Sequence, residues 1–293
     1  MSMFNGLFGS SNAPTMNVSN SYNGSGVGAQ ILYGLAYIGI LFLVIMFVEL
    51  LYKYYNRLSM NRTTLVANTI KDGKTLVIPQ NPNMPGSNTV NPSNNERTGV
   101  EFSYSFYMNV DPSSFQGADQ TDSLLHIFHK GYASQFPLLA PGVYMHSNHN
   151  TLRVYMNTYK TWNNYIDIEN IPVSKWVHIV IVCKEHALEV YVNGNIAKKM
   201  SFDGYSPYQN YQDICVFSGR SITLQKVKTT SLIENFKVSK AMTGMLSRLT
   251  YFSYGLCYSE IQQLMNQGPS SQMDSTQTAD IPPYLADNWW TQS

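Results

Sequence analysis

The order of hydrophobic and polar positions separates one long apolar stretch from a region of short alternating stretches. Ile31–Leu51 is apolar except for Glu49. As a helix rising ~1.5 Å per residue, this stretch spans about 30 Å, the thickness of the hydrocarbon core of a bilayer. Tyrosines and basic residues follow directly, as is typical of a membrane interface. We predict a transmembrane helix over residues 31–55 rather than a buried helix, which rarely runs so long without charge, or a signal peptide, since no basic residue precedes it.

Clear alternation of apolar and polar positions begins after this segment, near residue 100. Val100–Val110 alternates over its whole length, which is the period of a strand packed on one side. Trp176–Cys183 is apolar on both faces, as a central strand would be. Ala187–Val192 and Ile196–Phe202 flank Asn193-Gly194, the dipeptide that favours a tight hairpin turn. These three segments predict an antiparallel meander.

Further short segments complete a β domain. Strands are also expected at Leu124–Lys130, Gly142–His146, Thr151–Asn157, Asp213–Phe217, Ile222–Val227 and Leu246–Tyr254. Their regular spacing with turn signals between them predicts a sandwich or barrel. Ser259–Gln267 has apolar residues at helical spacing and is followed by Gly268, a C-cap glycine. The expected fold class is mainly β: an antiparallel β-sandwich with one short C-terminal helix, plus the N-terminal transmembrane helix.

The remaining segments differ from this domain in composition. Residues 1–30 are rich in Ser, Asn and Gly, and we expect them to be flexible. Residues 56–98 are predicted to be a juxtamembrane linker, because Pro79–Gly99 is dense in Pro, Asn and Gly and only Thr75–Ile78 resembles a strand. The domain is expected over 99–268, followed by a tail over 269–293 with an apolar end. Large apolar side chains near the two termini are candidates for partner docking: Phe4, Phe8, Tyr284, Trp289 and Trp290.

Charge and cysteine content narrow the choice of partners and compartment. The formal net charge is +1, so electrostatics do not suggest a nucleic-acid partner. Cys183, Cys215 and Cys257 are an odd number and widely spaced, which predicts mostly buried thiols in a reducing compartment rather than a disulfide framework. No charged residue precedes Glu49, and basic residues follow the apolar stretch. The positive-inside rule therefore places the C-terminal domain in the cytosol, the alternative being an external domain.

Two longer stretches resemble a known family. Trp176–Phe202 (WVHIVIVCKEHALEVYVNGNIAKKMSF) is similar to the laminin-G-like, concanavalin A-like jelly roll, in which a Trp-x-His strand leads through a hairpin to Tyr-x-Asn-Gly. Thr243–Pro269 (TGMLSRLTYFSYGLCYSEIQQLMNQGP) is similar to the closing element of that family. EFSYSFYMNV and LLHIFHKGY fit its opening strands. Cys257 departs from the family, which usually has Ser, Thr or Asp as the helix cap at this position. The resemblance implies a jelly roll over 99–268.

The family includes lectins, glycoside hydrolases and protein-binding modules. The retaining hydrolases carry Glu-x-Asp-x-x-Glu along one strand, because two carboxylates must flank the sugar bond. Here Tyr165 stands at the nucleophile position and Asn170 at the acid position, with Asp167 and Glu169 between them. We therefore expect no catalytic residues and no enzyme activity.

Metal and sugar sites are weighed by residue type and spacing. His126 and His129 are three apart in a predicted strand and should point to opposite faces. His146 and His149 lie in a loop and are expected to be solvated, His178 is expected to be a structural core residue, and calcium binding by Asp111, Asp119 and Asp122 matches no fixed motif. We therefore predict no metal and no cofactor. Aromatic faces beside amide groups make one candidate glycan face: Tyr155, Asn157, Tyr159, Trp162 and Asn164.

The architecture as a whole resembles membrane-anchored minor capsid proteins of large icosahedral DNA viruses with an internal membrane. This resemblance implies a non-enzymatic, single-pass virion protein whose jelly roll contacts capsid subunits, with the lipid bilayer and other structural proteins as partners. The N-terminus would be translocated and the domain would lie on the cytosolic side, at the interface of membrane and shell. The alternative is a membrane-anchored, lectin-like surface protein that binds glycans.

Overall fold

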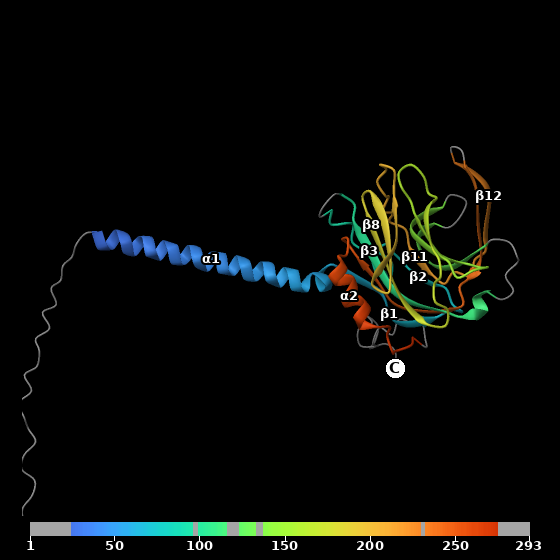
Figure 1. The fold of residues 1–293 in the computed structure, drawn as a ribbon, viewed down its shortest axis with the longest axis horizontal. Coiled ribbons are helices and arrows are strands. Elements are labelled where there is room, and N and C mark those ends of the chain that lie inside the picture. The colour runs from blue at the N-terminus through green and yellow to red at the C-terminus, as the bar shows by residue number, and fades with distance from the viewer. Residues whose placement is uncertain (1–24, 96–98, 116–122, 133–136, 230–231, 275–293) are drawn as a thin grey trace, which may run out of the picture. The chain divides into compact units, whose positions relative to one another are not determined.

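The computed structural model describes residues 25–95, 99–115, 123–132, 137–229 and 232–274 (Figure 1). The chain forms two compact units, residues 1–56 and 57–293. The helix α1, Ser25–Met60, makes up the described part of the first unit and ends within the second. It extends beyond both ends of the predicted 31–55 segment.

The apolar part of α1 agrees with the predicted helix. Gly26–Tyr54 is long and apolar enough to cross a membrane, with a mean hydropathy of 2.6 in its most apolar window. Within the described ranges, no residue of that window is buried against another part of the chain. Near its end, Lys53 Nζ lies 2.7 Å from Glu49 Oε1, the ion pair expected at this spacing. By length and composition, a helix that is apolar on all sides over such a distance is suited to a lipid environment.

The second unit consists of two β-sheets, the first of which has six strands in the order β1-β14-β3-β8-β9-β10. Every pair of neighbours in this sheet is antiparallel. The strands are β1 Arg62–Lys71, β3 Phe102–Val110, β8 Trp176–Lys184, β9 Ala187–Val192, β10 Asn195–Ser201 and β14 Gly244–Phe252. Asn193 and Gly194 have positive φ angles of 46° and 78°, so the predicted hairpin turn between β9 and β10 is confirmed.

The second sheet has eight strands, with the path β12-β13-β4-β5-β6-β7 and with β11 pairing both β4 and β2. All its pairs are antiparallel except β13 with β4, which is parallel. The strands are β2 Leu76–Ile78, β4 Leu124–Tyr132, β5 Leu138–His146, β6 Leu152–Met156, β7 Asn164–Ile168, β11 Ile214–Val216, β12 Ile222–Thr229 and β13 Leu232–Ala241. The predicted mainly β, antiparallel fold is confirmed.

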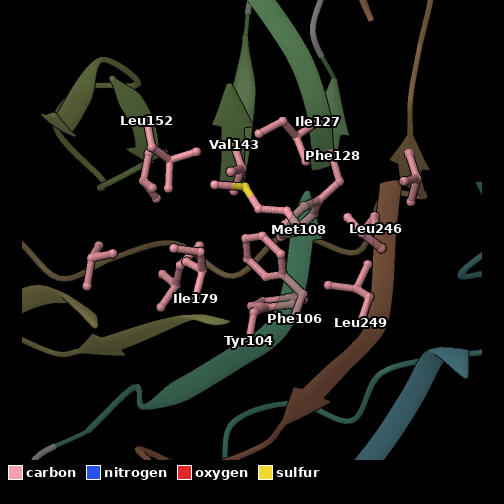
Figure 2. Packing of buried hydrophobic residues seen from close by; sticks show 14 of the residues in the cluster. Tyr104, Phe106, Met108, Ile127, Phe128, Val143, Leu152, Ile179, Leu246 and Leu249 are labelled. Atoms are coloured by element: carbon pink, nitrogen blue, oxygen red, sulfur yellow. The ribbon is translucent and has the colours of Figure 1, made fainter. Parts of the chain in front are cut away.

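The main hydrophobic core lies between the two sheets (Figure 2). Tyr104, Phe106 and Met108, alternate residues of β3, all point into it and are fully buried. They meet Phe128 and Val143 of the second sheet, and the rings of Phe106 and Phe128 pack edge to face at 5.2 Å between centroids. The period-two pattern of Val100–Val110 therefore defines the core-facing side of β3 as predicted.

One short helix, α2, packs on the outer side of the first sheet. It spans Tyr258–Gln267, where the C-terminal helix was expected, and ends at Gly268 with a positive φ of 67°. Ile261 and Leu264 bury against Val180, Val182 and other outward residues of the first sheet. At its N-terminus, the Cys257 amide donates to Glu260 Oε2 at 2.7 Å, so a glutamate in the first turn compensates for the atypical cap residue.

Two buried tyrosines of β3 provide a matched stability test. The Tyr104 hydroxyl has no hydrogen-bond partner among the described residues, whereas the Tyr107 hydroxyl donates to the carbonyls of Leu264 and Met265 at 2.8 and 2.7 Å. A buried hydroxyl without a partner opposes folding, so Tyr104→Phe should leave the free energy of unfolding unchanged or raise it by up to about 1 kcal/mol. Tyr107→Phe should lower it by about 1–2 kcal/mol. Urea unfolding of the full-length chain in detergent measures both; a larger loss for Tyr104→Phe would contradict this assignment.

The structure corrects the predicted linker over 56–98. Arg62–Lys71 is an edge strand of the first sheet, paired with β14 from Arg62↔Phe252 to Lys71↔Met245. Leu76–Ile78 pairs with β11. The Pro- and Asn-rich stretch that follows is also attached to the domain: Asn88 Nδ2 donates to the Thr64 carbonyl at 2.8 Å. The missing alternation in β1 has a physical cause, because two register shifts place buried residues next to each other and break the period of two.

Candidate binding surfaces

The outer face of the second sheet carries a cluster of aromatic side chains. The strands β5, β6 and β7 place Tyr144, Tyr155 and Tyr165 on this face, while other residues of the same strands face the core. Phe236 of β13 and Trp162 complete what we call the outer aromatic cluster, in which the Tyr155 and Trp162 rings stack 6.1 Å apart. Tyr144, Tyr155 and Phe236 are almost completely buried. The cluster therefore acts as a second hydrophobic core rather than as an open platform for a ligand.

A charged pair closes one end of this cluster. Arg153 of β6 and Asp167 of β7 are direct cross-strand partners, and two guanidinium nitrogens donate to the carboxylate at 2.7 and 2.6 Å. The Arg153 guanidinium also lies 4.0 Å from the centre of the Tyr165 ring. Burial opposes the charge on Asp167, but the hydrogen bonds from Arg153 and the nearby His146 ring outweigh it and hold the pKa of this carboxyl well below its usual range. A carboxylate held this way is unsuited to act as a proton donor.

The five residues of the predicted glycan face do not form one exposed surface. Tyr155 and Asn157 are buried, and the Asn157 side chain accepts a hydrogen bond from the Leu139 amide. Trp162 and Asn164 are half-buried, with Asn164 Nδ2 donating to Thr158 Oγ1 at 3.0 Å. Only Tyr159 is well exposed, at 73%. The sequence showed which strand residues alternate, but it did not show that other side chains bury Tyr155 on the outer face of the second sheet.

Tyr159 belongs instead to a different surface, formed with a loop that the sequence reading did not single out. The Tyr159 amide donates to the Ser206 carbonyl at 3.2 Å, and Thr158 and Pro207 form an isolated β-bridge. These contacts bring together Tyr159, Lys160, Tyr205 and Tyr208. With the exposed Tyr211, three residues further along the same loop, we call these residues the tyrosine surface. The Tyr159 and Tyr208 rings meet edge to face at 5.4 Å, and Lys160 Nζ lies 4.5 Å from the Tyr205 ring centre. The spacing of three tyrosines at 205, 208 and 211 was the available sequence signal.

A small pocket of about 40 Å³ adjoins the tyrosine surface and is lined by Gln80, Val90, Lys130, Gln209 and Tyr211, among others. The Lys130 ammonium group is buried and donates to the carbonyls of Asn210 and Gln212 at 2.7 and 2.8 Å. Burial lowers the pKa of Lys130 to about 8, against the opposing charge of Asp213. These two hydrogen bonds connect Lys130 of β4 to the loop that carries Tyr205, Tyr208 and Tyr211, and they hold this loop in a fixed position.

The prediction that the side chains of His126 and His129 point to opposite faces of their strand is wrong. His126 Nε2 lies 2.6 Å from His129 Nδ1. The cause is a register shift between β4 and β5, where Ile127 and Phe128 both turn toward the core, so that His126 and His129 lie on the same outer face. Among the described residues, no group of three or more metal-ligating side chains is placed to hold an ion.

The expectation that His146 and His149 are solvated holds for His149, which is exposed, but is wrong for His146, which is buried at the end of β5. His146 and His149 stack with their ring centres 4.5 Å apart, and His146 Nε2 lies 3.8 Å from Asp167 Oδ1. His178 is buried on the first sheet, where Nε2 contacts Ser105 Oγ at 2.9 Å, in line with a structural role. Burial lowers the pKa of His178 to about 4.

Several predicted residues lie outside the described ranges, so their prediction stands untested: Asp119, Asp122, Phe4, Phe8, Tyr284, Trp289 and Trp290. Asp111 is described, and its carboxylate accepts a hydrogen bond from the Ser113 amide at 2.9 Å. The three cysteines are free thiols, of which Cys183 is buried.

Comparison with family models identifies the domain. A laminin-G-like model described as the concanavalin A-like lectin/glucanases superfamily matches residues 85–244, more than half of the chain. The chain belongs to this superfamily. The family resemblance predicted from the sequence is thereby confirmed, and the match begins within the segment that the sequence reading assigned to a linker. No curated protein matches the chain.

Several solved structures match the chain at low sequence identity. The receptor-binding domain of botulinum neurotoxin D is 10% identical, with a TM-score of 0.44 over 71% of this chain and 44% of that one. The ligand-binding domain of serotype D in complex with N-acetylneuraminic acid is 9% identical, with a TM-score of 0.42 over 70% and 51%. The binding domain of Paraclostridial Mosquitocidal Protein 1 is 15% identical, with a TM-score of 0.41 over 71% and 47%. The present chain thus spans about half of each of these three structures.

Proposed function

We propose that this protein is a non-enzymatic, membrane-anchored structural protein whose jelly roll binds neighbouring proteins. The observation that carries the proposal is α1, whose apolar Gly26–Tyr54 section is not buried by any part of the chain that the structure describes. Leaving this much apolar surface in water is unfavourable by about 25 cal/mol per Å², so the helix belongs in a bilayer. Lys53 and Arg57 at its C-terminal end favour a cytosolic location for the jelly roll.

More specifically, we propose that the protein is a minor capsid protein that links an internal viral membrane to the capsid shell. The anchor holds the jelly roll at a fixed membrane surface, which raises its local concentration at a capsid subunit. The tyrosine surface is suited to contact such a partner, because exposed tyrosines provide large contact area and hydrogen bonds at low entropic cost. The locked Asp167 and the substitution of Tyr165 and Asn170 at the hydrolase positions favour binding over catalysis.

Protease protection on sealed membranes carrying the full-length chain tests the anchor and its orientation. With a tag at each end, we expect the C-terminal domain to be digested from the cytosolic side and the chain to resist extraction at alkaline pH. Release of the intact chain by alkaline extraction would overturn the anchor. Protection of the domain would reverse the orientation and remove the shell-facing proposal.

A second candidate function is carbohydrate binding by an external domain, and the tyrosine surface is the observation that favours it. Pyranose rings stack on exposed aromatic faces, and the Tyr159 side chain is 73% exposed. Glycan-array binding of the full-length protein should then be lost in Tyr159→Ala. Tyr132→Ala is the matched control, because Tyr132 is 54% exposed on β4. Equal effects of the two substitutions, or no binding by the parent protein, would argue against this function.

A further inference from the structure

We infer that His126 and His129 form an acid-sensitive latch that holds the start of the β11–β12 connection against β4. Ser218, the second residue after β11, donates its backbone N–H to His126 Nδ1 at 2.9 Å. The other ring nitrogen of His126 faces His129 Nδ1 at 2.6 Å. Two hydrogen bonds in series thus run from a loop backbone through one imidazole to the next, on the outer face of the second sheet.

The positions of the protons follow from these two contacts. Because His126 Nδ1 accepts from Ser218, the neutral ring must carry its proton on Nε2. That proton is donated to His129 Nδ1, so His129 must also carry its own proton on Nε2. Both bonds are satisfied only when neither ring is charged.

One additional proton on either ring breaks this series of two hydrogen bonds. A proton on His126 Nδ1 faces the Ser218 N–H, and two donors then point at each other. A proton on His129 Nδ1 faces the His126 Nε2–H, and the clash is relieved only if His126 moves its proton to Nδ1, which again displaces Ser218. Acid therefore releases Ser218 whichever ring it protonates first.

Among the described residues, no carboxylate raises the pKa of either ring. Tyr144 of β5 packs edge to face on His126 at 5.5 Å, and Cys215 of β11 is the cross-strand partner of His129. On β13, Ala241 pairs with His126, and the charged residue next to it is Lys240. Burial holds the pKa of His126 well below its usual range, and the charge of His129 lowers it further. Burial also lowers the pKa of His129 to about 4.

The direction of the pH dependence follows from linkage. The closed latch binds fewer protons than the open one. The stabilisation of the closed state is therefore complete above pH 6.5 and is lost as the pH falls toward 4. For a group with a pKa of 6.5 when released and about 4 when closed, lowering the pH from 7.5 to 4.5 should raise the open fraction about 70-fold.

Hydrogen exchange on the full-length protein in detergent tests the latch. After correction for intrinsic exchange, peptides covering residues 217–222 should exchange about 70-fold faster at pH 4.5 than at pH 7.5, while peptides from β3 and β8 stay protected. His126→Asn places an amide oxygen where Nδ1 lies and cannot titrate, so its exchange in this segment should be nearly independent of pH. His186→Asn, at a side chain that is 68% exposed, should behave like the parent protein. Equal pH dependence in the parent and His126→Asn would overturn the proposal.

A second measurement on the unmodified protein guards against a variant that does not fold. Nitrogen-15 spectra of histidine-labelled protein at pH 7.5 should show both His126 and His129 as Nε2–H tautomers. A His126 ring with its proton on Nδ1 would rule out the acceptor role toward Ser218, and with it the latch.

Discussion

Gly131→Ala is expected to destabilise the protein by at least about 4 kcal/mol, a large part of the stability of a typical domain. Gly131 has a φ of +126°, a region that side-chain-bearing residues rarely adopt. A Cβ at this position would collide with the carbonyl oxygen of Leu138, which belongs to the paired strand β5, and would lie 2.9 Å from Asn210 Nδ2. Neither backbone can move away, because the Gly131 amide also donates to the Asp213 carbonyl at 3.1 Å.

Gly73→Ala is the matched control for this clash. Gly73 has a nearly identical φ of +121°, but no atom lies within 4 Å of the Cβ that alanine would add. Gly73→Ala should lower the free energy of unfolding by about 1–3 kcal/mol, which is the cost of the backbone strain alone. Urea or thermal unfolding of both variants in detergent separates the two contributions, and equal losses would show that the contact with Leu138 is unimportant.

Asp167→Asn is expected to have the second largest effect, a loss of roughly 2–3 kcal/mol at pH 7. The substitution keeps the shape of the side chain but removes the charge that pairs with Arg153, whose side chain is only 17% exposed. The guanidinium would then remain half-desolvated without a counter-ion. Because the folded-state pKa of Asp167 is depressed, the stabilisation is complete above the usual carboxyl pKa of 3.8 and is lost as the pH falls below it.

Glu169→Gln serves as the control on the same side of the sheet. Glu169 lies just past the end of β7 and is exposed, so its neutralisation should change stability by no more than about 0.5 kcal/mol. Urea unfolding at pH 7 measures both substitutions. Adding Arg153→Met to Asp167→Asn should restore part of the lost stability, since it removes the unpaired charge. A double variant as unstable as the sum of the two single variants would show that the pair is not coupled.

The strands that could be predicted from the sequence are those with uninterrupted alternation or clear turn signals. The pattern of Val100–Val110 and the Asn193-Gly194 turn placed β3 and the β8–β9–β10 meander correctly. β7 and β13 were not predicted: β7 is short and lies among asparagines, and β13 pairs with β4 across more than a hundred residues. Local periodicity carries no information about such distant pairing.

The binding surfaces were harder to predict than the fold, because they depend on how segments cover one another. A β-bulge shifted His129 to the side of His126, and a bulge has no fixed sequence pattern. The candidate glycan residues were grouped by position in the chain, yet Tyr155 lies within the outer aromatic cluster while Tyr159 contacts a loop nearly fifty residues away. Only the tertiary structure separates these two environments.

The pairing of β1 with β14 has a consequence for synthesis of the protein. β1 leaves the ribosome directly after α1, but its only strand-length partner among the described residues, β14, begins at Gly244. At ~5–20 residues per second, the ribosome needs on the order of ten to forty seconds to reach that strand. During this interval the segment next to the membrane helix has no partner in its own chain. Closure of the first sheet therefore waits until β14 has been synthesised, and a chaperone that shields β1 would act in this interval.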